Sequence, residues 1–159
     1  MEVEVTQKRE LALGRRAAIV GLQHAMQALP TEGVVIGDKL IVPVTKDHFP
    51  VKHHFAPYSY GREMFLPKDS AVVGQIHKHA HVNVISQGRV RVFTEQEGAL
   101  ELTAPLTFVS SPGTKRAVEV LEDTIWTTFH VVSMKDPTLE DLPAIAQEVI
   151  ATDFQEEQT

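Results

Sequence analysis

Six of the eight histidines lie in two short clusters, and the second cluster has the spacing of a candidate metal site. It falls in the stretch GQIHKHAHVNVISQG, residues 74–88. Alternate residues of a β-strand share a face, so one face of this segment would carry Gln75, His77, His79, His81 and Asn83. Neutral imidazole suits Zn, Fe, Ni, Cu or Mn, and ligands held on rigid strands leave coordination positions open for a small molecule. The spacing therefore favours a divalent metal site.

The same spacing limits how the cluster can bind. Residues four apart on a straight strand are roughly 13 Å apart, whereas a metal–nitrogen bond is about 2 Å. Either the chain turns near Ala80, or only two of the three histidines bind and another segment supplies the rest. The alternative to a built site is an exposed histidine face on an edge strand, with incidental metal affinity.

His130 is the candidate from another segment. Residues 116–121 and 124–132 are typical of two strands, and we expect a hairpin around Glu122 and Asp123. His130 would then lie opposite Lys115 or Arg116, at the open end of the hairpin. One face of this hairpin would mix apolar and polar groups, as a barrel interior with one functional end does; it carries Arg116, Val118, Val120, Trp126, Thr128 and His130.

The predicted site has two groups of residues. The predicted metal ligands are His77, His79, His81 and His130, and the predicted pocket residues are Gln75, Arg116 and Trp126. Two other polar groups are interpreted differently. Arg62 and Glu63 face opposite sides of a predicted strand, so at most one of them lines the barrel while the other is solvated or paired; the favoured interpretation is a surface charge. His48, His53 and His54 lie among prolines, which favours a loop or a subunit contact.

The remaining elements must position these residues. Apolar residues recur at helical spacing from Gln7 to Leu29, and Pro30 ends the pattern. Short β-rich runs separated by turn signals then extend to Val132, which predicts antiparallel strands. Helical spacing returns after Pro137. We expect one domain: an amphipathic helix over residues 1–30 packed on the barrel or a partner, a small antiparallel β-barrel or jelly roll over 31–135, and a helix and tail over 136–159.

Composition excludes several classes of protein. The 159 residues are 43% hydrophobic and 23% charged, which is typical of a globular domain, and the net charge is −6. Strong binding to nucleic acid or an anionic membrane needs dense positive charge, so neither is expected. The absence of cysteine excludes disulfides and thiolate sites. No secretory signal or membrane span is visible, and we expect a cytoplasmic protein.

With these features, the sequence resembles a cupin. The first cupin motif is glycine, five residues, His-x-His, three or four residues, glutamate, six residues and glycine. If Gly88 is the last glycine, His81 stands in place of the glutamate and Gln75 and His77 in place of the pair; a shift of two residues puts His77 and His79 on the pair. The second motif contains Pro-x-Gly-x-x-His, and SPGTKR, residues 111–116, matches it except that Arg116 replaces the histidine. His130 is our proposed substitute.

A closer resemblance is to uncharacterised cupin-like proteins of tailed bacteriophages. It is carried by residues 53–67, 77–90 and 111–130. The resemblance implies a small barrel holding a divalent ion (Fe, Ni, Mn or Zn) on histidines, often in a dimer. An all-histidine site keeps the full charge of the ion and favours a small anionic ligand, with Arg116 as a carboxylate or phosphate anchor. The first hypothesis is a metal-binding cupin, possibly a metal-dependent enzyme; the alternative is a non-enzymatic virion component or host-interaction protein that uses the barrel as a scaffold, in the host cytoplasm or the virion.

Overall fold

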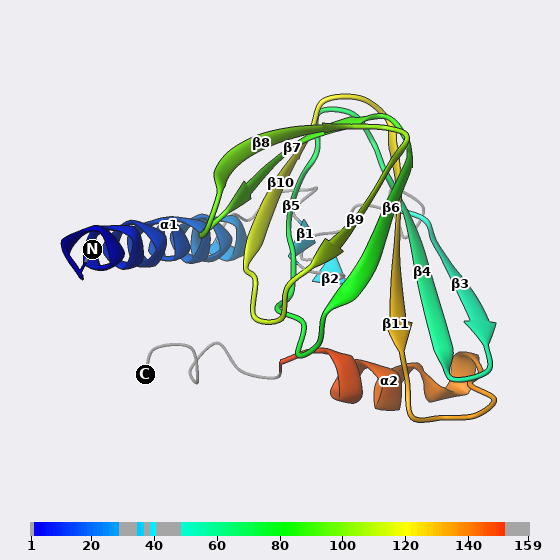
Figure 1. Ribbon diagram of the computed structural model, residues 1–159. Helices are drawn as coiled ribbons and strands as arrows, with labels where there is room; N and C mark the ends of the chain where they lie inside the picture. The colour runs from blue at the N-terminus through cyan, green and yellow to red at the C-terminus, as the bar shows by residue number, and fades with distance from the viewer. Residues whose placement is uncertain (1, 29–34, 37–38, 41–48, 152–159) are drawn as a thin grey trace.

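The computed structural model describes residues 2–28, 35–36, 39–40 and 49–151 of the chain (Figure 1). It is mainly β, with two α-helices, as the sequence predicted. His48 lies outside the described residues. The elements, in chain order, are α1 (Glu2–Ala28), β1 (Val35–Ile36), β2 (Lys39–Leu40), β3 (Val51–Ala56), β4 (Ser59–Leu66), β5 (Ala71–Val73), β6 (His81–Gln87), β7 (Arg89–Thr94), β8 (Gly98–Thr103), β9 (Leu106–Ser110), β10 (Arg116–Val120), β11 (Thr124–Val131), a 3-10 turn η1 (Leu139–Asp141) and α2 (Leu142–Val149).

The strands form two sheets. Sheet A has the order β2-β1-β5-β10-β7-β8, and sheet B has the order β3-β4-β11-β6-β9. All pairings are antiparallel except that of β1 with β5. The chain crosses from β6 in sheet B to β7 in sheet A at Gly88, which has φ +89° and no room for a Cβ atom against Asp123 and Thr124. Only glycine adopts this conformation without strain.

The inner faces of the two sheets enclose an apolar core at one end of the molecule. Alternate residues of each strand point inward, as the period of two requires. Ile85 and Val90 have no exposed surface, although they belong to different sheets. The buried members of this core are Phe49, Leu66, Val72, Ile85, Val90, Val92, Val118, Val120 and Trp126.

The two helices lie at different places on this body (Figure 1). Ile19 and Met26 of α1 pack against Val73 and Ala117 of sheet A, while the N-terminal half of α1 extends beyond the strands. Helix α2 begins after a capping box formed by Thr138 and Asp141 and lies across the end of the strands opposite the apolar core. No helix in the described part of the chain has both the length and the apolar character needed to cross a membrane.

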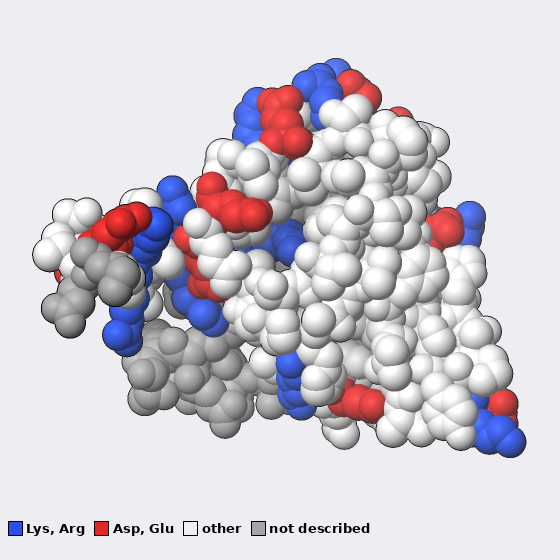
Figure 2. Space-filling model, viewed as in Figure 1, with Lys and Arg blue, Asp and Glu red and all other residues white. Residues whose placement is uncertain are grey.

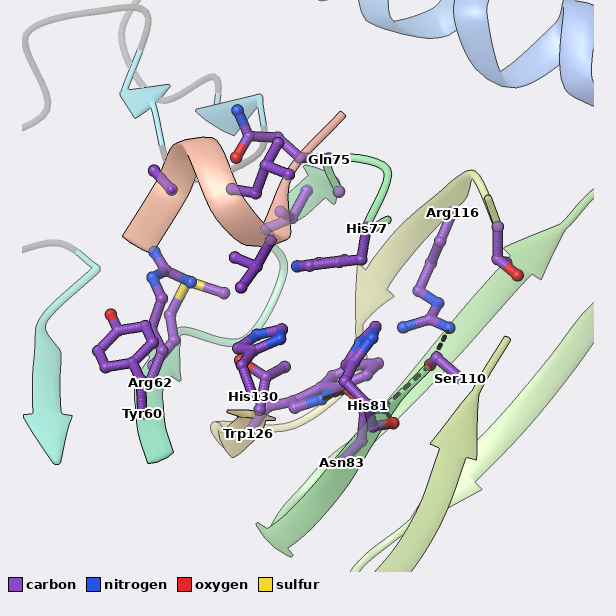
Figure 3. Close-up of a pocket in the computed structure, with 18 of the residues that line it drawn as sticks. Tyr60, Arg62, Gln75, His77, His81, Asn83, Ser110, Arg116, Trp126 and His130 are labelled. Carbon is purple, nitrogen blue, oxygen red and sulfur yellow. Dashed lines mark hydrogen bonds between the residues drawn. The ribbon is translucent and has the colours of Figure 1, made fainter. Parts of the chain in front are cut away.

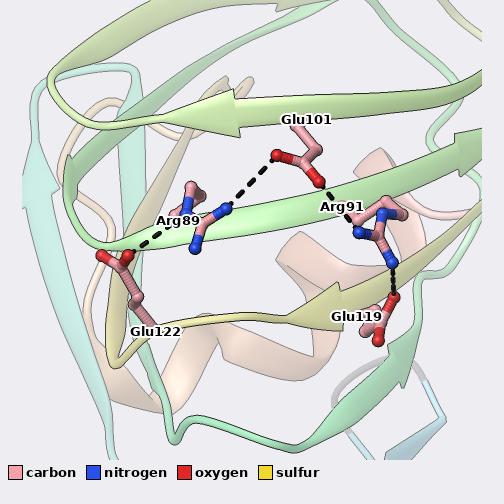
Figure 4. Close-up of polar contacts among 5 residues, drawn as sticks. All are labelled: Arg89, Arg91, Glu101, Glu119 and Glu122. Carbon is pink, nitrogen blue, oxygen red and sulfur yellow. Dashed lines mark hydrogen bonds and ion pairs between the residues drawn. The ribbon is translucent and has the colours of Figure 1, made fainter.

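The outer faces of the two sheets differ in charge. Sheet A carries a ladder of ion pairs in which Arg91 bonds to Glu101 at 2.9 Å and to Glu119 at 2.8 Å, and Arg89 bonds to Glu101 and Glu122 (Figure 4). The outer face of sheet B is largely uncharged, and Figure 2 shows few charged side chains over β6, β9 and β11.

Candidate functional site

Three of the four predicted ligands lie together at the end of the interior that α2 covers (Figure 3). The ring centroids of His77 and His81 are 4.3 Å apart, those of His77 and His130 are 5.0 Å apart, and those of His81 and His130 are 4.9 Å apart. We call these residues the histidine trio. His81 is at the start of β6 and His130 is near the end of β11, so sheet B holds two of the three rings.

The second histidine cluster does not form the continuous strand that its alternation predicted. Residues 74–80 run between β5 and β6 without strand structure, except that His77 bridges to Ile150, and the chain bends at Lys78 and His79. The bend brings His77 and His81 to the same cavity and leaves His79 exposed, outside the cavity wall. The spacing left two alternatives: a turn near Ala80, or two histidines completed by another segment. In the structure two histidines of the cluster lie together, and the third ring, His130, comes from another segment.

His130 reaches the site by a route that differs from the predicted hairpin. β10 pairs with β5 and β7 in sheet A, whereas β11 pairs with β4 and β6 in sheet B, so the hairpin prediction is wrong. Arg116 and His130 nevertheless face the same cavity, because β10 and β11 lie in opposite sheets and both turn these residues inward. The apolar and polar residues assigned to one hairpin face are thus the two walls of one interior.

The imidazoles of the histidine trio are held neutral. Burial, with smaller effects from His81, His130, Arg116 and Arg62, lowers the pKa of His77 to about 3. Burial, with smaller effects from His81, Arg62 and His79, lowers the pKa of His130 to about 4. Burial also lowers the pKa of His81. Neutral imidazole carries the lone pair that a metal ion needs, so the cavity keeps all three rings in their ligating form.

One ring nitrogen in the trio lacks a partner. Nδ1 of His81 lies 3.3 Å from the backbone carbonyl of His79, which can only accept, so this bond assigns the proton to Nδ1. Nε2 is then a lone-pair donor; it is buried and makes no hydrogen bond. A backbone carbonyl that fixes the tautomer in this way is the usual support for a metal-bound histidine.

The donor set fits a divalent ion, although its nitrogens are not arranged as a completed site. A metal–nitrogen bond of about 2.1 Å puts ring centroids roughly 4.6 Å apart at octahedral angles and roughly 5.3 Å apart at tetrahedral angles, and the observed separations of 4.3–5.0 Å are closer to the octahedral value. Within the described residues, however, no group of three or more His, Asp or Glu side chains has the geometry to hold an ion. Ion binding would therefore require the rings to reorient.

A buried hydrogen-bond network positions Arg116 beside the trio. Trp126 Nε1 donates to Asn83 Oδ1 at 2.9 Å, and Asn83 Nδ2 donates to Ser110 Oγ at 2.9 Å. Arg116 Nη2 donates to the same hydroxyl at 2.7 Å, and its guanidinium lies 5.6 Å from the Trp126 ring centroid. The Nε of Arg116 is buried without a partner. The network fixes the guanidinium at the cavity wall. All three predicted pocket residues, Gln75, Arg116 and Trp126, line the cavity.

Several cavity residues were not identified from the sequence. Arg62, which the sequence suggested was a surface charge, lines the cavity, whereas Glu63 contacts Lys52 and His54 outside. His53 lies on β3 rather than in a loop, and its Nδ1 is 2.7 Å from the Tyr60 hydroxyl. The strand period could place Arg62 and Glu63 on opposite faces, but not say which face was internal.

The cavity is small and closed on one side by the C-terminal helix. Its volume is about 190 Å³, the space of roughly six water molecules in the liquid. Leu142, Ile145 and Val149 of α2 form an apolar wall. Backbone hydrogen bonds of 2.9 Å, from Lys78 to Val149 and from Ala151 to Ile76, tie the end of this helix to the segment that carries His77.

The charges around the cavity are all of one sign. Arg62 and Arg116 line it, and none of the described residues that line it is Asp or Glu. Burying a cation without an opposite charge is costly, so the arrangement suits an anionic ligand.

No protein-family model matches the chain, and no curated protein matches it. Similar solved structures include a cupin superfamily protein from Desulfitobacterium hafniense (6% identity, 58% of this chain and 85% of that chain, TM-score 0.47) and KdgF from Halomonas sp. (16% identity, 62% and 88%, TM-score 0.46). A cupin 2 domain-containing protein from Halorhodospira halophila is another (16% identity, 72% and 91%, TM-score 0.46).

Proposed function

We propose that this protein is a cupin-like jelly roll that holds a divalent metal ion (Fe, Ni, Mn or Zn) on His77, His81 and His130 and binds a small anionic molecule beside it. The observation that carries the proposal is the buried, unpartnered Nε2 of His81, which lies within a trio of neutral imidazoles. A divalent ion would supply Lewis acidity toward an oxygen of the ligand.

The other cavity residues bind and orient the ligand. Arg116 is held by Ser110 with its guanidinium over Trp126, which presets it to bind a carboxylate or phosphate. The apolar wall of α2 excludes water, which strengthens each charge interaction inside. The fourth predicted ligand, His79, is exposed, so we expect it to contribute little to metal affinity.

Metal content per chain tests this proposal. Untagged wild-type protein should carry near one equivalent by plasma mass spectrometry, and His77→Ala/His81→Ala should lose it while keeping its unfolding temperature. The matched control is His54→Ala, which removes an exposed imidazole on the outer face and should retain the ion. No metal in wild type after reconstitution with each candidate ion, or equal metal in both variants, would overturn the proposal.

A second candidate function, self-assembly, is favoured by the outer face of sheet B. Val109 pairs with Val82, and Val82 pairs with Phe129, across three neighbouring strands. These side chains are 66%, 39% and 40% exposed, and Val131 on the same face is 82% exposed. We call this set the valine face. A contiguous apolar patch of this kind marks an interaction surface.

The partner that best fits this face is a second copy of the chain. A two-fold contact places a patch against itself, and a patch without charged side chains buries no like charges in that contact. The ion-pair ladder keeps the outer face of sheet A solvated, which leaves sheet B as the face for a homodimer. This use of the fold would serve a virion component or a host-interaction protein.

Molar mass by light scattering over a range of concentrations tests the assembly. Wild type should be dimeric and Val82→Lys/Val109→Lys monomeric, whereas Leu100→Lys, which charges an exposed residue of sheet A, should stay dimeric. Leu11→Lys/Leu22→Lys tests the exposed positions of α1. A monomeric wild type, or dissociation by the α1 variant alone, contradicts the valine face as the interface.

A further inference from the structure

Two arginines flank the histidine trio from opposite sides of the cavity (Figure 3). Arg116 comes from β10 in sheet A, and Arg62 comes from β4 in sheet B. Figure 3 shows Arg116 on the His81 side of the trio and Arg62 on the His130 side, and both arginines line the same cavity.

Neither arginine forms an ion pair with any carboxylate in the described part of the chain. Arg116 bonds to a neutral hydroxyl, and Arg62 Nη1 has only the thioether of Met64 at 3.6 Å. The contrast with the outer face is direct, since Arg89 and Arg91 there each contact two glutamates. Both cavity guanidiniums thus have N–H donors to offer to a ligand, and neither contacts a carboxylate of the described chain; Glu97 acts on Arg116 only through its field.

The separation of the two arginines by the histidine trio limits which anions can contact both of them. The histidine trio lies between them, and Met64, Leu66, Val72 and Val118 add apolar wall nearby. One small anionic group can reach one guanidinium, and the other would stay uncompensated. A molecule with an anionic group at each end neutralises both and places its middle against the trio and the apolar wall.

We infer that the ligand of this site is a small dianion of the dicarboxylate class, with one carboxylate on Arg116 and Ser110 and the other on Arg62. The cavity of about 190 Å³ limits it to a short carbon chain. The inference rests on the proposed function only for the contact between a metal ion on the trio and the middle of the ligand. The two arginine contacts need no metal ion.

Calorimetric titration of metal-free and metal-loaded protein with malonate, succinate, glutarate, butyrate and inorganic phosphate tests the inference. At least one dicarboxylate should bind ten-fold or more tighter than butyrate, because it makes a second charge-assisted contact. Phosphate distinguishes a single compact dianion from two separated carboxylates; binding of phosphate as tight as that of every dicarboxylate overturns the inference.

Substitutions of the two arginines show which of them binds each carboxylate of the ligand. Arg62→Gln should weaken the dicarboxylate about ten-fold and leave butyrate unchanged, whereas Arg116→Gln should weaken both. Arg62→Lys and Arg116→Lys keep the charge and should retain part of the affinity, which guards against misfolding of the glutamine variants. Arg89→Gln, on the outer face, is the matched control and should bind as wild type does.

The outcomes separate this inference from the metal proposal. If metal-free protein binds a dicarboxylate with the expected arginine dependence but takes up no ion, the metal proposal fails and the dianion stands. If the protein holds its ion and shows no preference for dicarboxylates, or Arg62→Gln has no effect, the dianion is overturned and the metal proposal stands. Absence of anion binding in both forms also overturns the dianion.

Discussion

The two ends of the interior are built from the same two sheets but differ in polarity and in their effect on stability. At one end Ile85 and Val90 meet side chains of the opposite sheet with no exposed surface and no polar partner to satisfy. At the other end the same strands present His81, Arg116 and His130 to a cavity under α2. The apolar end stabilises the fold, while the polar end costs stability through buried imidazoles and a buried guanidinium that forms no ion pair with a described carboxylate. The binding role proposed for the polar end would account for this cost in stability.

Truncation at the apolar end should have the largest effect on stability. Ile85→Ala removes a fully buried side chain and leaves a cavity, which should lower the free energy of unfolding by about 3–4 kcal/mol. Urea denaturation measures this loss. Val109→Ala, which shortens a side chain that is 66% exposed, should cost less than about 0.5 kcal/mol and serves as the control. Similar losses for the two variants would mean that the apolar end does not dominate the stability.

Acid should destabilise the polar end selectively. His77 and His130 have pKa values of about 3 and about 4 in the folded state, below the value of about 6.5 expected in the unfolded chain. Between these values the unfolded state binds more protons, so stability falls as the pH decreases from 6.5 toward 4. The loss in metal-free protein should reach on the order of 2–4 kcal/mol at pH 5.

Denaturation between pH 7.5 and pH 4.5 in the presence of a chelator gives this profile. The double variant His77→Gln/His130→Gln should flatten it, since an uncharged amide has no proton to bind in this range. An unchanged slope in the double variant would show that other groups control the acid response.

A smaller effect, of opposite sign, is expected at Arg116. Arg116→Met keeps most of the side-chain length and removes the buried cation, so it should raise the free energy of unfolding by about 1 kcal/mol while abolishing anion binding. Arg91→Met on the outer face breaks two exposed ion pairs and should change stability by less than about 0.5 kcal/mol, without a gain. A destabilised Arg116→Met would mean that its bond to Ser110 is worth more than its desolvation costs.

Strand alternation predicts which side chains of a strand point inward, but it does not predict which strands pair. Alternation correctly put Arg116, Trp126 and His130 on inward faces, because each is set by its own strand. It could not tell that β10 and β11 belong to different sheets, because neighbours in sequence pair in many β folds but cross over here. Turn-forming residues such as Glu122 and Asp123 occur both in hairpins and in connections between two sheets, so they do not distinguish the two.

Long-range packing explains the features that the sequence did not reveal. Arg62 could be placed opposite Glu63, yet only the position of sheet A shows which of the two is internal. The bend at Lys78 and His79 depends on backbone pairing with Val149, more than 70 residues away by number, and no local pattern encodes that contact. The same contact makes α2 a wall of the cavity, whereas its helical period alone predicted only a helix after Pro137.

The pairing of the His77 segment with the end of α2 also couples the cavity wall to the histidine trio. The backbone N–H of Lys78 donates to Val149 and that of Ala151 donates to Ile76, both at 2.9 Å. A displacement of α2 that breaks these bonds removes the apolar wall and, at the same time, the restraint on the backbone beside His77. Opening of the cavity and loosening of one ring of the trio are therefore a single local event.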